Sequence, residues 1–195
     1  MVGRTYAMFD TSLGRCGIAW SDGGVIGVQL PAMREIETRR ELLRRFPDAR
    51  ERTPPPDIAP AIDAVSSALR GQSHAAAGLP LDMTSAPPFS RRVYELLQRV
   101  PRGETVSFDE IASRLGMTGV IHSVKQAISR NPFPVLVPCH RAVPSPGETS
   151  GAPTFGGIVT RSRLLALEGA LAGRGVTLFD ALLSLAPPPR SAESA

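Results

Sequence analysis

Hydrophobic residues follow two different periods in the first 71 residues. Residues 15–20 (RCGIAW) and 25–30 (VIGVQL) are β-prone runs on either side of the turn sequence SDGG, which predicts a β-hairpin. Residues 34–46 and 58–71 instead place hydrophobics three and four positions apart, as amphipathic helices do, and Gly71 closes the second pattern. The helical positions expected to face a core are Ile36, Leu42, Leu43, Phe46, Ile58, Ile62, Val65 and Leu69.

The composition changes between the two halves of the chain. Residues 73–88 are rich in Ala, Gly, Ser and Pro, which predicts a linker or an extended crossing between two folded units. We therefore expect an α+β protein with a small N-terminal α/β domain over 1–72, made of a hairpin or sheet plus helix. A mainly helical C-terminal domain is expected over 89–172, and residues 173–195 form a tail.

The second half carries helix signals in close succession. Residues 89–100 are amphipathic, and Ser107 is suited to cap the next helix because Glu110 completes a capping box. That helix ends at Gly116, and a third is expected over 119–130, which gives a helix-turn-helix in a winged-helix-like domain. Helix pairs of this kind are also common in proteins that never contact DNA, so the pattern alone leaves the partner open.

Composition restricts the class of protein. Hydrophobic residues make up 42% of the 195 positions, and no apolar run approaches the ~18 residues that a membrane helix needs. The first residues lack the apolar segment of a signal peptide, so we expect a cytoplasmic protein with no membrane partner. Cys16 and Cys139 are too few for a disulfide framework, and no ligand spacing suggests zinc. We expect reduced thiols and no bound metal.

The net charge of +4 comes almost wholly from arginine, since Lys125 is the one lysine in the sequence. A basic balance permits nucleic-acid binding. An arginine-rich solvated surface explains the same charge equally well, so charge does not decide between the two.

Candidate chemistry lies in the sequence PVLVPCHRAV, where Cys139 and His140 are adjacent. A thiol attacks only as thiolate, so it needs a nearby base, and neighbouring residues on a strand point to opposite faces. A tight turn or a bridging water would be required to connect them. Glu168 could orient the histidine, and Asn131 could pin the loop before the cysteine.

Each of these residues also has an ordinary structural explanation. A lone cysteine after an apolar run is usually an inert core residue, and a neighbouring histidine is usually packed or solvated. Glu168 could be a solvated helix residue, and Asn131 could be a helix C-cap.

The combination of motifs is more specific than its parts. VSFDEIASRLG, NPFPVLVPCHRAV, a following GG and LLALEG together resemble the O6-alkylguanine-DNA alkyltransferase family. The resemblance is strong over residues 89–170 and fainter over the first 70. It implies that the helix-turn-helix enters the minor groove, that the damaged guanine is flipped out, and that Cys139 takes its alkyl group irreversibly. In the family pattern His140 takes the thiol proton through a water, Glu168 supports it, and Asn131 holds the site together, with no cofactor.

Several positions depart from the family pattern on the DNA side. Phe108 stands where a tyrosine assists the leaving guanine, and His122 stands where an arginine inserts into the duplex. Lys125 and Gln126 are long where the family has small residues, whereas Ser123 remains small. The resemblance implies DNA contacts from Phe108, His122, Ser123, Lys125, Gln126 and Arg141, and a substrate pocket formed by Phe108, Pro134, Val137, Thr154 and Phe155.

The expected partner is double-stranded DNA containing alkylated guanine, bound by a monomer. The departures keep three alternatives open. The protein could bind lesions as a sensor without transferring the alkyl group, or its cysteine could accept alkyl groups from donors other than duplex DNA. It could also be a structural paralogue with an inert cysteine.

Overall fold

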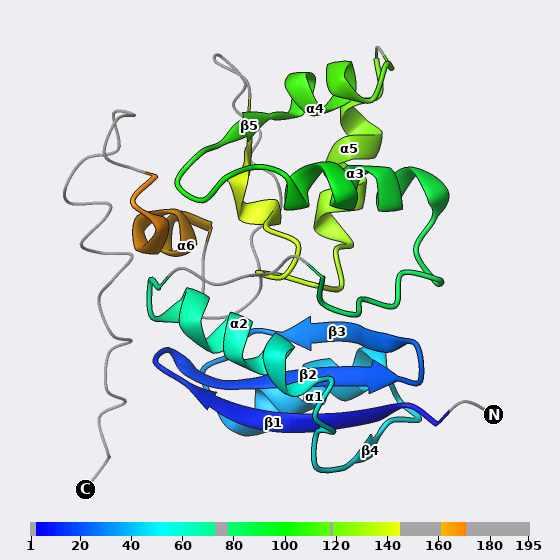
Figure 1. Ribbon diagram of the computed structural model, residues 1–195, viewed down its shortest axis with the longest axis vertical. Coiled ribbons are helices and arrows are strands. Elements are labelled where there is room, and N and C mark those ends of the chain that lie inside the picture. Colours follow the sequence, from blue (N-terminus) through cyan, green and yellow to red (C-terminus); the bar gives the residue numbers. More distant parts are fainter. Residues whose placement is uncertain (1–2, 73–77, 118, 145–160, 171–195) are drawn as a thin grey trace, which may run out of the picture.

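The computed structural model describes residues 3–72, 78–117, 119–144 and 161–170. The N-terminal half is built on a sheet with the strand order β3-β2-β1-β4 (Figure 1). The predicted hairpin is confirmed as antiparallel β2 (Gly14–Ser21) and β3 (Gly24–Gln29). Two further strands were not predicted: β1 (Thr5–Thr11), which pairs antiparallel with β2, and the short β4 (Arg50–Glu51), parallel to β1. The expected α+β class is confirmed.

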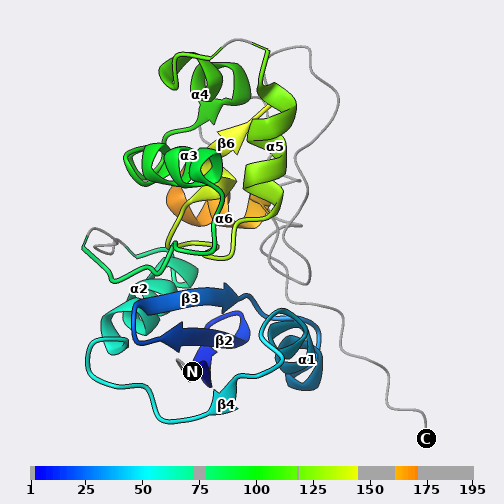
Figure 2. The same ribbon diagram turned by 90° about the vertical axis from the view of Figure 1, so that its right-hand side faces the viewer.

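The two faces of this sheet are covered by different helices, which Figure 2 shows on opposite sides of the strands. Alternation along β2 sends Cys16, Ile18 and Trp20 into the main core, where α2 (Ala59–Leu69) packs. Ala19 points to the other face and packs with Leu42 of α1.

The face of α1 (Glu35–Arg45) that is buried differs from the expected one. Leu42 is fully buried, but Ile36 is 65% exposed, so its predicted core position is wrong. The reason is local packing. A Cβ on Gly17 would lie 2.8 Å from Leu42 Cδ2, so α1 lies close against β2 at this residue. The buried line of the helix then passes through Thr38 and Leu42.

The C-terminal half is mainly helical, as expected. It contains α3 (Pro88–Gln98), α4 (Phe108–Arg114), α5 (Ile121–Ser129) and α6 (Arg161–Glu168). The predicted cap is confirmed, since the Ser107 side chain accepts a hydrogen bond of 3.1 Å from the backbone N–H of Glu110. The helices of the predicted helix-turn-helix are α4 and α5.

A short parallel pairing ties the start of α4 to the chain beyond Cys139. Strand β5 (Val106–Ser107) pairs with β6 (Ala142–Val143). The helix-turn-helix is therefore fixed to the segment that carries the cysteine. The winged-helix description of this half stays a prediction.

Residues 80–82, ahead of α3, run along the edge of the sheet beside β3. The backbone N–H of Val25 donates to the carbonyl of Pro80 over 2.7 Å, and that of Asp82 donates to the carbonyl of Val25 over 2.8 Å. One continuous hydrophobic core contains residues of both halves. The proposed domain boundaries stay a prediction.

The loop of residues 131–138 links both halves to the cysteine. Its Pro132 carbonyl accepts hydrogen bonds from the backbone N–H of Val28 (2.8 Å) and from the side chain of Arg45 (3.1 Å). Val135 has φ of 75°, a left-handed conformation that is unfavourable for a β-branched residue. The apolar run is thus a buried loop, one of the two forms expected for it. Within the described ranges, no helix combines the length and the apolar content needed to cross a bilayer.

Candidate active site

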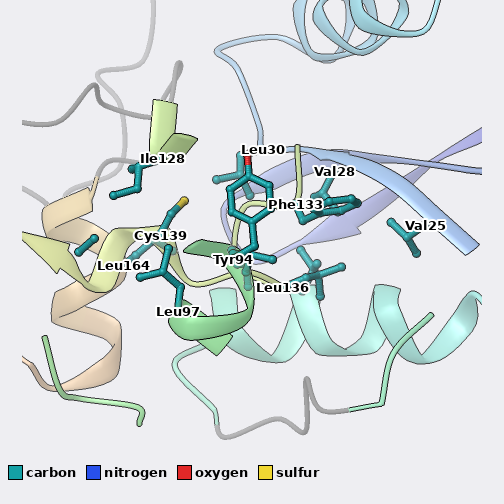
Figure 3. Packing of buried hydrophobic residues seen from close by; sticks show 14 of the residues in the cluster. Val25, Val28, Leu30, Tyr94, Leu97, Ile128, Phe133, Leu136, Cys139 and Leu164 are labelled. Atoms are coloured by element: carbon teal, nitrogen blue, oxygen red, sulfur yellow. The ribbon is translucent and has the colours of Figure 1, made fainter. Parts of the chain in front are cut away.

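Cys139 begins a single turn of 3-10 helix, η1 (Cys139–Arg141), directly after Pro138. Cooperation between the cysteine and the histidine requires a tight turn or a bridging water, and a tight turn is present here. The cysteine is completely buried. In Figure 3 it lies among Leu97 of α3, Ile128 of α5 and Leu164 of α6.

Asn131 makes direct contact with the cysteine. Its Nδ2 donates to Cys139 Sγ over 2.9 Å and to the carbonyl of Val137 over 3.0 Å. Its Oδ1 accepts from the backbone N–H of Phe133 over 2.9 Å, which fixes the orientation of the amide because an N–H can only donate. Asn131 is thus more than a helix C-cap, and its N–H group favours a negatively charged sulfur.

A buried cluster of charges supports His140. Glu168 Oε1 lies 2.8 Å from His140 Nε2, and both oxygens of Glu168 accept hydrogen bonds from Arg141, over 2.9 and 2.7 Å. Arg141 Nη1 also donates to the carbonyl of Val100 over 2.6 Å. Burial alone would raise the pKa of Glu168, but the hydrogen bonds from His140 and Arg141 outweigh it and lower the pKa to about 2. Glu168 is therefore a carboxylate.

The carboxylate determines the state of the imidazole. A carboxylate only accepts hydrogen bonds, so His140 Nε2 carries the proton and Nδ1 carries the lone pair. Burial lowers the pKa of His140, and the contact with Glu168 opposes this only in part, so the ring is neutral. Nδ1 is buried and has no hydrogen-bond partner among the residues that the structure describes. The site therefore contains a neutral buried base.

The cysteine itself needs such a base. Burial raises the pKa of Cys139 to about 12, while the hydrogen bond from Asn131 and the positive charge of Arg161 act in the opposite direction. Cys139, His140 and Glu168 thus provide a nucleophile, a base and a group that orients the base. No group of three potential ligand side chains in the described part of the chain could hold a metal ion.

Some of the residues expected to contact DNA are exposed, and Phe108 is buried. On α5, His122, Ser123 and Gln126 are exposed. Lys125 of the same helix places its Nζ 5.4 Å from the ring centroid of Phe108, which is fully buried.

Arg141 lies inside the protein in this structure, and the DNA contact predicted for it stays a prediction. Its side chain is only 9% exposed, and its guanidinium group binds Glu168 and the carbonyl of Val100 inside the protein. All three guanidinium nitrogens of Arg141 are engaged within the protein. Arg141 fixes the carboxylate that orients His140.

The expected substrate pocket can be described only in part. Pro134 and Val137 are buried in the loop before the cysteine, whereas Thr154 and Phe155 lie outside the described residues. A cavity of about 470 Å³ lies between α3 and α5, and its lining includes Tyr94 and Gln126 but not Cys139. This cavity is therefore separate from the cysteine.

Sequence reasoning missed two residues near the site. Tyr94 of α3 is 1% exposed, and its hydroxyl donates to the carbonyl of Ala127 in α5 over 2.9 Å. Arg161, at the start of α6, interacts electrostatically with Cys139. The amphipathic pattern of residues 89–100 could have revealed Tyr94, which follows the core position Val93. No local signal pointed to Arg161.

Comparison with known proteins agrees with this geometry. Residues 88–170 match the family described as 6-O-methylguanine DNA methyltransferase, DNA binding domain. The methylated-DNA–protein-cysteine methyltransferase of Methanothermobacter thermautotrophicus is 32% identical over 153 residues, which cover 78% of each chain. The chain belongs to the methylated-DNA–protein-cysteine methyltransferase family.

Other members of the methyltransferase family are similar over different lengths. The Mycolicibacterium paratuberculosis protein of the same name is 41% identical over 92 residues, so the alignment spans about half of each chain (47% of this one and 54% of that one). The crystal structure of Mycobacterium tuberculosis O6-methylguanine methyltransferase superposes with a TM-score of 0.62 and 28% identity, and covers 91% of this chain and 99% of that one. The similarity therefore extends over both halves of the fold.

Proposed function

We propose that this methyltransferase repairs DNA by moving an alkyl group from O6 of guanine to Cys139, once per protein molecule. The observation that carries the proposal is the contact of Cys139 with the Asn131 amide, next to the neutral base His140 and its carboxylate Glu168. The family assignment supports the same reaction, since its members are named for a protein cysteine that accepts the methyl group.

The reaction balances with the groups present. The sulfur lone pair of Cys139 attacks the alkyl carbon, a C–S bond forms, and the bond between that carbon and guanine O6 breaks with its electron pair. The thiol proton leaves toward His140, and the departing guanine takes up a proton, so the net products are guanine and S-alkylcysteine. No cofactor takes part in this scheme, because the lesion itself supplies the alkyl group.

DNA recognition is assigned to the exposed face of α5. His122, Ser123 and Gln126 lie on this helix, and Lys125 adds a positive charge above Phe108. We propose that this face enters the minor groove and that the alkylated guanine is extruded toward the cysteine. We further propose that the protein acts as a monomer and in the cytoplasm.

The decisive experiment measures where the alkyl group goes. We expect the intact mass of the protein to rise by one CH₂ unit after incubation with a duplex containing O6-methylguanine, and peptide mapping to place the gain on Cys139. An otherwise identical duplex with plain guanine is the control. Tight binding without a mass gain would instead identify a lesion sensor. A gain only with single strands, free base or small alkylating agents would identify an acceptor for other donors.

His122→Arg is expected to tighten binding to duplex DNA about threefold to tenfold and to speed transfer, because a longer and permanently charged side chain inserts better into the groove. Fluorescence anisotropy with a labelled duplex measures the affinity. Gln98→Arg adds the same charge at an exposed position of α3 and serves as the matched control. Equal changes in both variants, or none in His122→Arg, would contradict the proposed role of position 122.

A further inference from the structure

One face of α6 carries two opposite charges separated by an apolar residue. Arg161, Leu164 and Glu168 are three and four positions apart, so they lie on the same side of the helix. Glu168 contacts His140 and Arg141, and Leu164 is 2% exposed and lies beside Cys139 in Figure 3. The face that carries Arg161 is therefore the face that α6 turns toward η1.

Arg161 is half-buried at the start of α6. Its Nε is buried and makes no hydrogen bond within the described part of the chain. Burial lowers the pKa of Arg161, and the negative charge of an ionised Cys139 opposes that effect. The positive charge of Arg161 in turn lowers the pKa of Cys139. The two side chains thus stabilise each other's charged forms.

Among the described residues, the other ionisable side chains of the site are paired or neutral. Arg141 is paired with Glu168 through two short contacts, and His140 is neutral. Tyr94 is also neutral, since burial raises its pKa to about 12. The titratable and charged side chains that interact with Cys139 or with its neighbours on the surrounding elements are Arg45, Tyr94, Arg130, His140, Arg141, Arg161 and Glu168.

We propose that Arg161 is a positioning residue for alkyl transfer, whose guanidinium stabilises the thiolate of Cys139 from the start of α6. Glu168, at the other end of the same helix, holds the base. The same positive charge disfavours protonation of His140, which keeps the imidazole in the form that accepts a proton. This inference rests on the proposed function, because it assigns the charge that assists the attacking sulfur.

The test compares variants of Arg161 by the pH dependence of the reaction. Arg161→Gln and Arg161→Met remove the charge, Arg161→Lys keeps it, and Arg99→Gln removes an exposed arginine directly after α3 as the matched control. The assay is single-turnover transfer from an O6-methylguanine duplex. In the Arg161→Gln and Arg161→Met variants, we expect the midpoint of the pH–rate profile to rise by about one pH unit and transfer at neutral pH to be about tenfold slower. The Arg161→Lys and Arg99→Gln variants should keep a pH midpoint and a transfer rate close to those of the parent protein.

A second readout does not depend on DNA. In a Cys16→Ser background, the rate of Cys139 alkylation by iodoacetamide is measured against pH. Its midpoint should rise in the Arg161→Gln and Arg161→Met variants and stay unchanged in Arg161→Lys, as in the transfer assay. Unchanged midpoints in Gln and Met, or the same shift in Lys as in Gln, would overturn the role of Arg161. Failure of the parent protein to accept methyl from DNA would overturn the proposed function instead, while the iodoacetamide profile would still decide on Arg161.

Discussion

Cys139→Ser is expected to lose alkyl transfer by at least about a thousandfold while the protein stays folded. The hydroxyl is nearly the size of the thiol, so the buried position remains filled and the Asn131 amide keeps an acceptor. A hydroxyl ionises far less readily than a thiol, and its oxygen is a poorer nucleophile toward an alkyl carbon. Single-turnover transfer from methylated duplex, followed by mass, measures the loss.

Cys16→Ser is the matched control for this prediction. Cys16 is also fully buried, but it lies in the sheet, and burial raises the pKa of its thiol to about 12. We expect this variant to keep its transfer activity as long as it is folded. Methyl uptake by folded Cys139→Ser, or loss of uptake in folded Cys16→Ser, would show that sulfur 139 is not the acceptor.

Glu168→Gln is expected to reduce the free energy of unfolding by about 3–5 kcal/mol, because it leaves the buried guanidinium of Arg141 without its counter-ion. It should also slow transfer strongly, since a neutral amide stabilises the imidazolium that forms when His140 takes the thiol proton less well than a carboxylate does. Urea unfolding gives the stability, and the transfer assay gives the rate. Glu110→Gln removes an exposed ion pair with Arg114 and should cost less than about 1 kcal/mol.

The pH dependence of this stability difference follows from the carboxylate. The pKa of Glu168 is lowered from 4.5 to about 2 in the folded protein, so its contribution is complete above about pH 4.5 and is lost as the pH falls toward 2. The stability gap between the parent and Glu168→Gln should therefore narrow over this range. A gap that stays constant from pH 6 to acid would contradict the assigned ion cluster.

Local sequence signals predicted most of the elements. The SDGG turn, the Ser107 cap with Glu110, and Gly71 after α2 each act through neighbouring backbone, and each is confirmed. The position of α1 was not fixed in this way, since the close approach of Leu42 to Gly17 is a contact between distant segments. Ile36 was therefore assigned to the wrong face.

In the candidate site, too, local motifs were predictable from the sequence and contacts between distant segments were not. The motif brought forward Cys139 and His140, but whether adjacent residues cooperate depends on the turn that the backbone adopts, and strand or turn could not be decided from letters alone. The DNA contact of Arg141 was implied by the family resemblance, which carries no information on what the side chain contacts inside this protein. Its partner Glu168 lies 27 positions further on, and such pairs have no local pattern.

The Pro132 carbonyl, held by β3 and by Arg45 of α1, makes the first half of the protein a mechanical support for chemistry carried out in the second. The sheet contributes no catalytic group, but its hydrogen bond to Pro132 helps to fix the position of the loop that precedes Cys139. A fragment that begins after the linker would keep Cys139, His140 and Glu168. It would lose the hydrogen bonds from the first half that hold the loop before the cysteine. The position of the cysteine loop thus depends on contacts from both halves of the protein.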